Sequence, residues 1–270
     1  MKIFKNALIS AVICALLACM LSGCNTGGTD TPSTAPVQGS QSTTSPQATQ
    51  STAPTQDTQP AADLIIESYT LEKDYTDEVG NSYKISYHIP KINISSPDAD
   101  RINSLIDKSL ASTAAAELEC MNMGASIFVF DIGYRYYING DILSLFVYQL
   151  SDVEIHIYEA YNINIVTGAE VNPTELLNTV GISPDQFIQN AKSILGRNYD
   201  SDIPEDMKDE FYHTQYANTV SDSNVNLNMP MYLNEKGELC FVGAVYSLAG
   251  ADYYYHVFNL ADGSEIKPAA

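Results

Sequence analysis

A long polar tract near the start of the chain limits where a folded core can form. Of the 32 residues from Thr31 to Ala62, 24 are Thr, Ser, Pro or Gln, and Val37 is the one β-branched apolar residue. Such a segment cannot bury enough apolar surface to offset the entropy that it would lose on ordering. We therefore predict that residues 24–62 form a disordered linker, and that the packed core lies within residues 63–270.

The first 24 residues have the pattern of a secretory signal. Lys2 and Lys5 precede an apolar run over residues 7–21, and Leu-Ser-Gly then leads to Cys24. A positive start, an apolar run and small residues before the cleavage site are typical of such signals. The ending resembles the lipobox of bacterial lipoproteins, whose cysteine receives a diacylglyceryl group. We predict residues 1–23 as the signal peptide and Cys24 as the lipidated residue, which anchors the protein to the extracytoplasmic face of the cell membrane.

The rest of the chain is strongly acidic. The full chain has 13 Lys+Arg and 33 Asp+Glu. Two bases leave with the signal and two acids lie in the linker, so residues 63–270 keep 11 bases and 31 acids, a net charge of −20. A nucleic-acid-binding surface needs Lys and Arg to replace the counterions of the phosphates, so we exclude nucleic acid as a partner. A cation is the counterpart that such a field attracts.

Residue periodicity predicts an α+β domain built on antiparallel sheet. Strands are expected at residues 64–75, 83–89, 127–138, 142–150, 153–166, 231–234, 238–248 and 253–260, and helices at 97–118, 172–177, 184–195 and 204–216. Asn139-Gly140 between two β-rich runs predicts a hairpin. Pro90, which has no N–H to donate, is expected to end the second strand. We expect one domain, with a subdivision near residue 123 as the alternative.

The first predicted helix carries the clearest local signals. Ser96 is a candidate N-cap, and Pro97 suits the first helical position. Apolar residues then recur at spacings of three and four: Ile102, Leu105, Ile106, Leu110 and Ala114. This pattern predicts that all five side chains lie on the buried face of the helix.

Two cysteines remain after the signal and the anchor, Cys120 and Cys240. Outside the cytoplasm the pair can form a disulfide. Alternatively, both are free thiols, because Cys240 lies in an apolar run where a buried thiol is a common filler. Neither cysteine belongs to a Cys-x-x-Cys motif, so no metal site or cofactor is predicted.

The order of several short motifs resembles a bacterial extracellular domain. The motifs are Ile89–Ile92, Asp100–Ile106, Asp141–Leu145, Tyr161–Gly168 and Met231–Leu239. They resemble a domain of unknown function that occurs in lysozyme-binding anti-sigma factors and beside the catalytic domain of some peptidoglycan deacetylases. This resemblance implies an extracellular binding domain at the cell wall. Where the family commonly has a Gly-Gly-Ala-His-like loop, this chain has Ser151–Ala160, so the partner need not be shared.

Motifs for catalysis are missing from the sequence. The four histidines, His88, His156, His213 and His256, lack the spacings of metal ligands, and each is interpreted as a surface or core imidazole. Serine nucleophile elbows and phosphate-binding loops are also absent. No catalytic residue is therefore predicted.

Two features of the sequence are candidates for binding. The first is an acidic run consisting of Asp200, Asp202, Glu205, Asp206, Asp209 and Glu210, for which a solvated helix face is the alternative. The second is the set of 18 tyrosines, grouped at residues 134–137 and 253–255, for which core packing is the alternative. The sequence predicts a cell-surface lipoprotein whose non-catalytic domain captures a cationic protein such as lysozyme, or a cell-wall glycan. The alternative is an enzyme or enzyme accessory acting on peptidoglycan.

Overall fold

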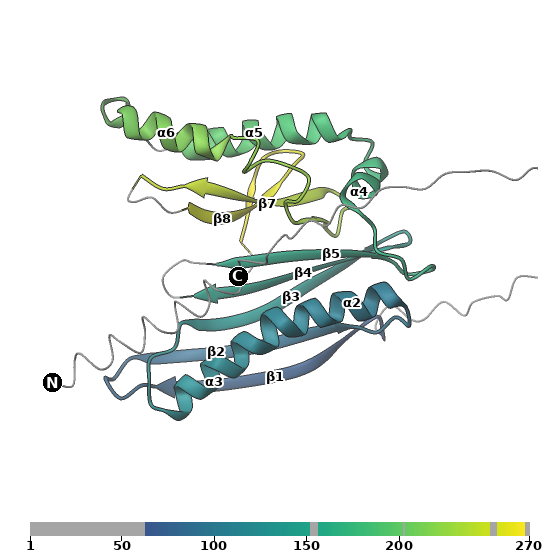
Figure 1. Cartoon of the computed structure of the whole chain (residues 1–270), viewed down its shortest axis with the longest axis vertical. Helices are drawn as coiled ribbons and strands as arrows, with labels where there is room; N and C mark the ends of the chain where they lie inside the picture. The colour runs from purple at the N-terminus through teal and green to yellow at the C-terminus, as the bar shows by residue number, and fades with distance from the viewer. Residues whose placement is uncertain (1–62, 152–155, 202, 249–252, 268–270) are drawn as a thin grey trace, which may run out of the picture. The chain divides into compact units, whose positions relative to one another are not determined.

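The computed structural model describes residues 63–151, 156–201, 203–248 and 253–267, which belong to one compact unit spanning residues 54–270. The predicted signal peptide, Cys24 and the whole of the predicted linker lie outside the described residues. The elements are β1 (Ile65–Thr76), β2 (Ser82–Ile92), α2 (Pro97–Ile106), the π-helical turn η2 (Asp107–Ala111), α3 (Ser112–Asn122), β3 (Val129–Asn139), β4 (Ile142–Ser151), β5 (Ile157–Asn164), α4 (Pro173–Thr179), α5 (Pro184–Asp200), the 3-10 turn η3 (Glu205–Met207), α6 (Glu210–Thr219), β6 (Met231–Leu233), β7 (Leu239–Tyr246), β8 (Tyr253–Asn259) and β9 (Glu265–Ile266) (Figure 1). Two sheets with interspersed helices confirm the α+β class.

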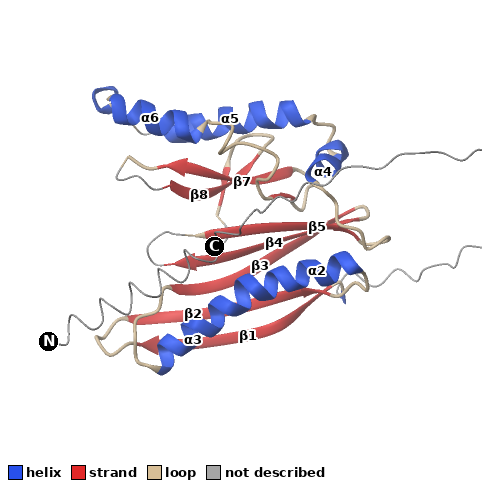
Figure 2. Ribbon diagram, in the orientation of Figure 1, coloured by secondary structure: helices blue, strands red, loops and turns tan. Residues whose placement is uncertain are grey.

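The first sheet has the strand order β1-β2-β3-β4-β5. The β1–β2, β3–β4 and β4–β5 pairs are antiparallel, and the Asn139-Gly140 hairpin is confirmed. The β2–β3 pair is parallel, because α2 and α3 carry the chain back along the sheet before β3 begins. These helices run along one face of the sheet in Figure 2. Residue 123 follows α3, so the alternative subdivision point falls within this helix-covered layer.

The helix that crosses between β2 and β3 contains one wide turn, η2. The fully buried residues before and after this turn are spaced by four, as Ile102, Ile106, Leu110 and Ala114. In an α-helix each step of four residues drifts about 40° around the axis, and a π-helical turn corrects this drift. The wide turn therefore keeps the residues spaced by four on the side of the helix that faces the sheet. Leu105 does not belong to this series, and although it was predicted on the buried face it is 42% exposed.

The prediction that Pro90 ends the second strand is wrong, since β2 continues to Ile92. Pro90 lies opposite Glu67, at an irregularity in β1, and β2 pairs with β3 only at Ser86 and Tyr87. The absence of an N–H at Pro90 therefore does not interrupt a regular series of hydrogen bonds between β2 and its neighbouring strands. The end of β2 is instead fixed by the buried Asn103 of α2, whose side chain accepts from the Ile92 N–H at 2.8 Å and donates to the Ile92 carbonyl at 2.9 Å.

The second sheet is antiparallel, with the order β6-β7-β8-β9. Its short last strand, Glu265–Ile266, has no counterpart in the sequence prediction. Capping boxes at Asn172 and Ser183 start α4 and α5, close to the predicted helix starts at residues 172 and 184. The helix predicted at residues 204–216 is divided into η3 and α6, because the Asp209 side chain caps a new helix at the Tyr212 N–H.

Three apolar clusters show that the unit is layered as helix, sheet, sheet and helix. The first cluster joins the first sheet to α2 and α3, and the second joins the second sheet to α4, α5 and α6. The third lies between the two sheets, where the Phe146 and Tyr232 ring centroids are 4.8 Å apart. Strand β4 is buried on both faces: Leu145 belongs to the first cluster and Phe146 to the third. This explains why its sequence is almost continuously apolar.

A buried polar network connects the two sheets. Ser144 on β4 donates a 2.6 Å hydrogen bond to the side-chain oxygen of Asn162 on β5, and the Asn162 amide donates to the Met231 carbonyl at 2.8 Å. The Leu233 N–H donates to the Ser144 hydroxyl at 3.0 Å. The backbone of β6 is thereby hydrogen-bonded to side chains of the first sheet, so these two polar residues hold the sheets in one arrangement.

The two cysteines are free thiols in this structure. Cys120 packs against the first cluster, and Cys240 is fully buried between the sheets in the third. Burial raises the pKa of the Cys240 thiol to about 12, so it is an unreactive filler. Of the two alternatives, the structure has the free thiols, and the disulfide is not formed.

The β1–β2 turn is organised by the buried Asp77 carboxylate. Asp77 accepts hydrogen bonds from the Ser126 hydroxyl at 2.6 Å and from the N–H groups of Asn81 and Val79 at 2.8 and 3.1 Å. The Ser126 bond contributes most to lowering the pKa of Asp77 from 3.8 to about 2, despite burial. Because the folded-state pKa is the lower one, the stabilisation is present above pH 3.8 and is lost as the pH falls toward 2.

Replacing Asp77 with asparagine is expected to flatten the acid side of the stability profile. The variant should have a lower urea midpoint than the wild type near pH 6, and the difference should shrink as the pH falls to about 2.5. The control is Asp74→Asn at an exposed position of β1, which should leave the profile unchanged. If the Asp77 variant lost stability in parallel with the wild type over this range, the proposed linkage would be wrong.

Candidate binding groove

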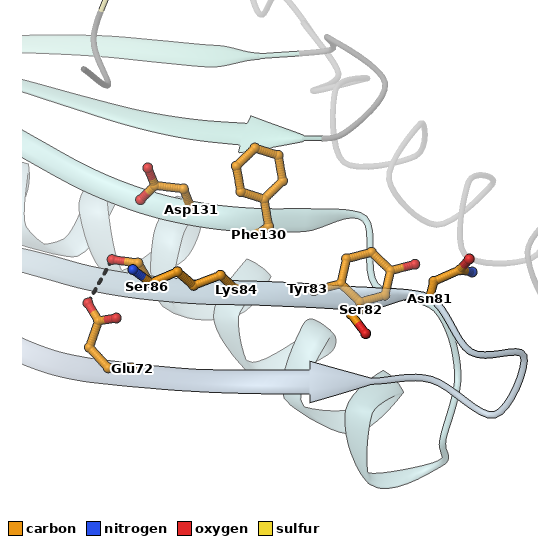
Figure 3. A pocket seen from close by; sticks show the side chains of 8 residues that line it. All are labelled: Glu72, Asn81, Ser82, Tyr83, Lys84, Ser86, Phe130 and Asp131. Carbon is orange, nitrogen blue, oxygen red and sulfur yellow. Dashed lines mark hydrogen bonds between the residues drawn. The ribbon is translucent and has the colours of Figure 1, made fainter.

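The side of the first sheet that faces away from α2 and α3 carries a groove over β1, β2 and β3. It consists of two adjoining cavities of about 850 and 650 Å³, and both are lined by Ser86 and Asp131. Figure 3 shows the larger cavity, in which Ser86 and Lys84 of β2 lie between Glu72 of β1 and Asp131 of β3. The lining is polar and aromatic, which is typical of a binding surface rather than of core packing.

Strand register explains which side chains meet in the groove. Glu72 pairs with Ser86, and Ser86 pairs with Asp131, so these three residues form one row across β1, β2 and β3. His88 and Gly133 lie two residues further along β2 and β3 than Ser86 and Asp131, and both line the second cavity. Gly133 pairs with Tyr148 of β4. These residues lie opposite the face that packs on the helices, because alternate residues of a strand point to opposite faces.

His88 is held between two glutamates of β1. Its Nε2 atom lies 2.8 Å from a carboxylate oxygen of Glu72, and its Nδ1 atom lies 3.1 Å from one of Glu67. The hydrogen bond to Glu72 is the main cause that raises the pKa of His88, and the bond to His88 in turn lowers the pKa of Glu72. Both glutamates are thus compensated when the imidazole is protonated.

Asp131 differs from these glutamates because no hydrogen bond to its carboxylate is found among the described residues. The side chain is half-buried, and this burial raises the pKa of Asp131. The charge of His88 acts in the opposite direction, and Glu72 adds to the increase. A desolvated carboxylate without a hydrogen-bond donor is stabilised by any cation that can approach it.

Gly133 shapes the groove because it leaves room for the ring of Tyr148. A Cβ atom at Gly133 would lie 2.3 Å from the Tyr148 hydroxyl oxygen, so the ring extends across β3 at the point where other residues would project a side chain. Burial raises the pKa of Tyr148, with a further contribution from the charge of Asp131. The Tyr148 ring therefore forms part of the groove wall beside Asp131.

Part of the acidic run that was predicted as a partner surface forms local ion pairs and a helix cap. Lys208 lies 2.9 Å from oxygens of both Asp200 and Glu205, and Asp209 caps α6. Asp206 and Glu210 remain exposed, and Asp202 lies outside the described residues. The structure does not bring this run together with the groove residues in either cavity lining.

The first tyrosine group is used mainly in packing, whereas Tyr253 and Tyr255 of the second group are exposed on β8. Tyr134 and Tyr136 pack against the first cluster, and Tyr137 stacks on Tyr232 at 6.0 Å. Tyr253 is 45% exposed in β8. Tyr134 also reaches the groove, where its hydroxyl donates to Glu67 at 3.3 Å.

Sequence reasoning missed the groove. The sequence indicates only a surface or core imidazole at His88 and does not single out Asp131, because residues on β2 and β3 become neighbours only through the parallel pairing. A glycine within the β-rich run at residues 127–138 was the one available signal, since glycine in a strand often marks a close approach of other groups.

Among the described residues no cluster of potential metal ligands is found, and no helix is long and apolar enough to cross a membrane. Comparison with known proteins yields no matching family model and no significant match to a curated protein.

Proposed function

We propose that this domain is a non-catalytic binding module that captures a cationic protein at the cell surface. The predicted lipid on Cys24 anchors the protein, and the groove on β1–β3 receives the partner. The observation that carries this proposal is the half-buried Asp131 carboxylate, which has no donor among the described residues and faces an open cavity. A cation on the partner supplies the missing charge.

The charge of the domain supports the same class of partner. The 31 acids and 11 bases of residues 63–270 produce a field that accelerates the approach of a basic protein, and added salt screens this field. The motif resemblance to a domain of lysozyme-binding proteins makes a basic lysozyme the first ligand to test.

Binding to immobilised lysozyme tests the proposal. The protein is the chain from residue 24 onward with Cys24→Ser, so that only the lipid is absent. We expect retention at low salt, weaker retention at high salt, and a loss of about tenfold or more in affinity for Asp131→Asn. The matched control is Asp206→Asn, which removes the same charge from the exposed acidic run.

The outcomes separate the two candidate surfaces. A larger loss for Asp206→Asn than for Asp131→Asn would place the partner on the acidic run instead of the groove. Absence of retention at every salt concentration would reject lysozyme as the partner.

A second candidate function is hydrolysis of a wall glycan, and one observation supports it. Glu72 and Asp131 lie in the same cross-strand row, and their pKa values are shifted in opposite directions. Such a divergence is typical of a general acid and a general base. Release of soluble fragments from purified peptidoglycan, abolished by Glu72→Gln, would support this function over binding.

A further inference from the structure

The groove contains three carboxylates, and only one of them lacks a donor among the described residues. Glu67 accepts hydrogen bonds from Thr70 and Tyr134 and contacts His88, and Glu72 accepts from Ser86 and contacts His88. Asp131, in the same row as Ser86, has no such bond. Asp131 is therefore the carboxylate of the groove that no hydrogen bond from the described residues stabilises.

The surroundings of this charge limit the shape of the cation. The Tyr148 ring lies across Gly133 next to Asp131, and no partner of the Tyr148 hydroxyl is found among the described residues. One carboxylate and one phenolic oxygen offer few acceptors. An ammonium group has three donors, so these two acceptors leave only one donor to solvent. A guanidinium has five donors in a planar fork, and one carboxylate that pairs with two of them leaves three for which the site offers only the phenolic oxygen.

We propose that the groove binds the primary ammonium group of a lysine side chain on a basic partner protein, with Asp131 as its counter-ion and Tyr148 against its methylene chain. This inference rests on the proposed function and specifies the group that the site selects. Lys84 and Arg135 also line the cavities, but neither forms a salt bridge with Asp131 among the described residues, and their charges act on Glu72 and Tyr148.

The charged and titratable groups around His88 set the expected pH dependence. They are Glu67 and Glu72 on β1, Lys84 on β2, and Asp131, Tyr134 and Arg135 on β3. Protonated His88 is a second cation beside Asp131, so it competes with the ligand. Affinity for an ammonium group should therefore rise as the pH increases through the raised pKa of His88, and it should fall in acid, where Asp131 is protonated.

The test compares lysozyme with a guanidinated form in which every lysine is converted to homoarginine. This conversion keeps the charge at each site but removes the primary ammonium group. Using the chain from residue 24 with Cys24→Ser, we expect the guanidinated form to bind about tenfold more weakly than native lysozyme. In Asp131→Asn this difference should disappear, and in the control Asp206→Asn it should persist.

Equal affinity for the two lysozymes in the wild type would overturn the ammonium site while leaving capture of a cationic protein intact. If neither form bound, lysozyme capture would fail, and the site would be tested with N-acetyl-lysine methylamide. This probe should shift the NMR signal of the Gly133 amide more than N-acetyl-arginine methylamide or N-acetyl-norleucine methylamide does. Equal shifts for the three probes would reject the ammonium site independently of the partner protein.

Discussion

Replacing Asn162 with leucine is expected to lower the free energy of unfolding by about 3 kcal/mol, because two buried groups lose their partners. The Met231 carbonyl loses its donor, and the Ser144 hydroxyl loses the acceptor that orients it toward the Leu233 N–H. Leucine has the same number of side-chain heavy atoms as asparagine and the same branch at Cγ, so the loss comes from unsatisfied polar groups and not from a cavity. Urea unfolding measures it as a lower midpoint with an unchanged m-value.

The control is Asn178→Leu, which makes the same chemical change at an exposed position of α4. It should alter the unfolding free energy by less than about 0.5 kcal/mol. A similar small effect at Asn162 would mean that packing alone holds the two sheets together. A reduced m-value for Asn162→Leu would instead indicate that the second sheet separates before the first unfolds.

Replacing Gly243 with valine is expected to destabilise the domain by about 2–3 kcal/mol through overpacking. A Cβ atom at Gly243 would lie 2.5 Å from a methyl carbon of Leu195, which is completely buried between α5 and the second sheet. Leu195 is packed within the second apolar cluster and has no exposed surface, so we expect the clash to displace the helix or the strand. The thermal midpoint and the urea midpoint should both fall.

The matched variant is Gly133→Val, for which the clash is with the far end of the Tyr148 side chain at 2.3 Å. That ring borders an open cavity and can swing outward, so the loss of stability should be below that of Gly243→Val. Binding of the basic partner should nevertheless weaken, because the displaced ring occupies the groove. If both variants lost stability equally, Tyr148 would be a core residue and the groove would be smaller than the cavity volumes indicate.

Local patterns in the sequence were sufficient to predict most individual elements. The β4 strand follows from an apolar run after Asn139-Gly140, and α5 follows from Ser183-Pro184 before a periodic apolar face. These signals act over a few residues, so they need no knowledge of the tertiary arrangement.

The candidate site could not be predicted, because it depends on long-range alignment. His88 and Asp131 come together only when β3 pairs in parallel with β2. The helix between these strands contains the wide turn η2, which apolar residues spaced by three and four do not predict. The acidic run illustrates the opposite error. Its charges are conspicuous in the sequence, whereas Lys208 and the cap of α6 already use three of them.

The wide turn η2 makes the helix between the two strands a spacer of defined length. Before this turn, the Asn103 side chain is hydrogen-bonded to the end of β2. After it, the Glu117 carboxylate accepts hydrogen bonds from the N–H groups of Phe128 and Val129, each at 3.0 Å, where β3 begins. One residue more or less between these two attachments would rotate Glu117 by about 100° away from β3. Insertions and deletions in this helix therefore act at a distance, because they move the register of β3 against β2 and with it the separation of His88 from Asp131.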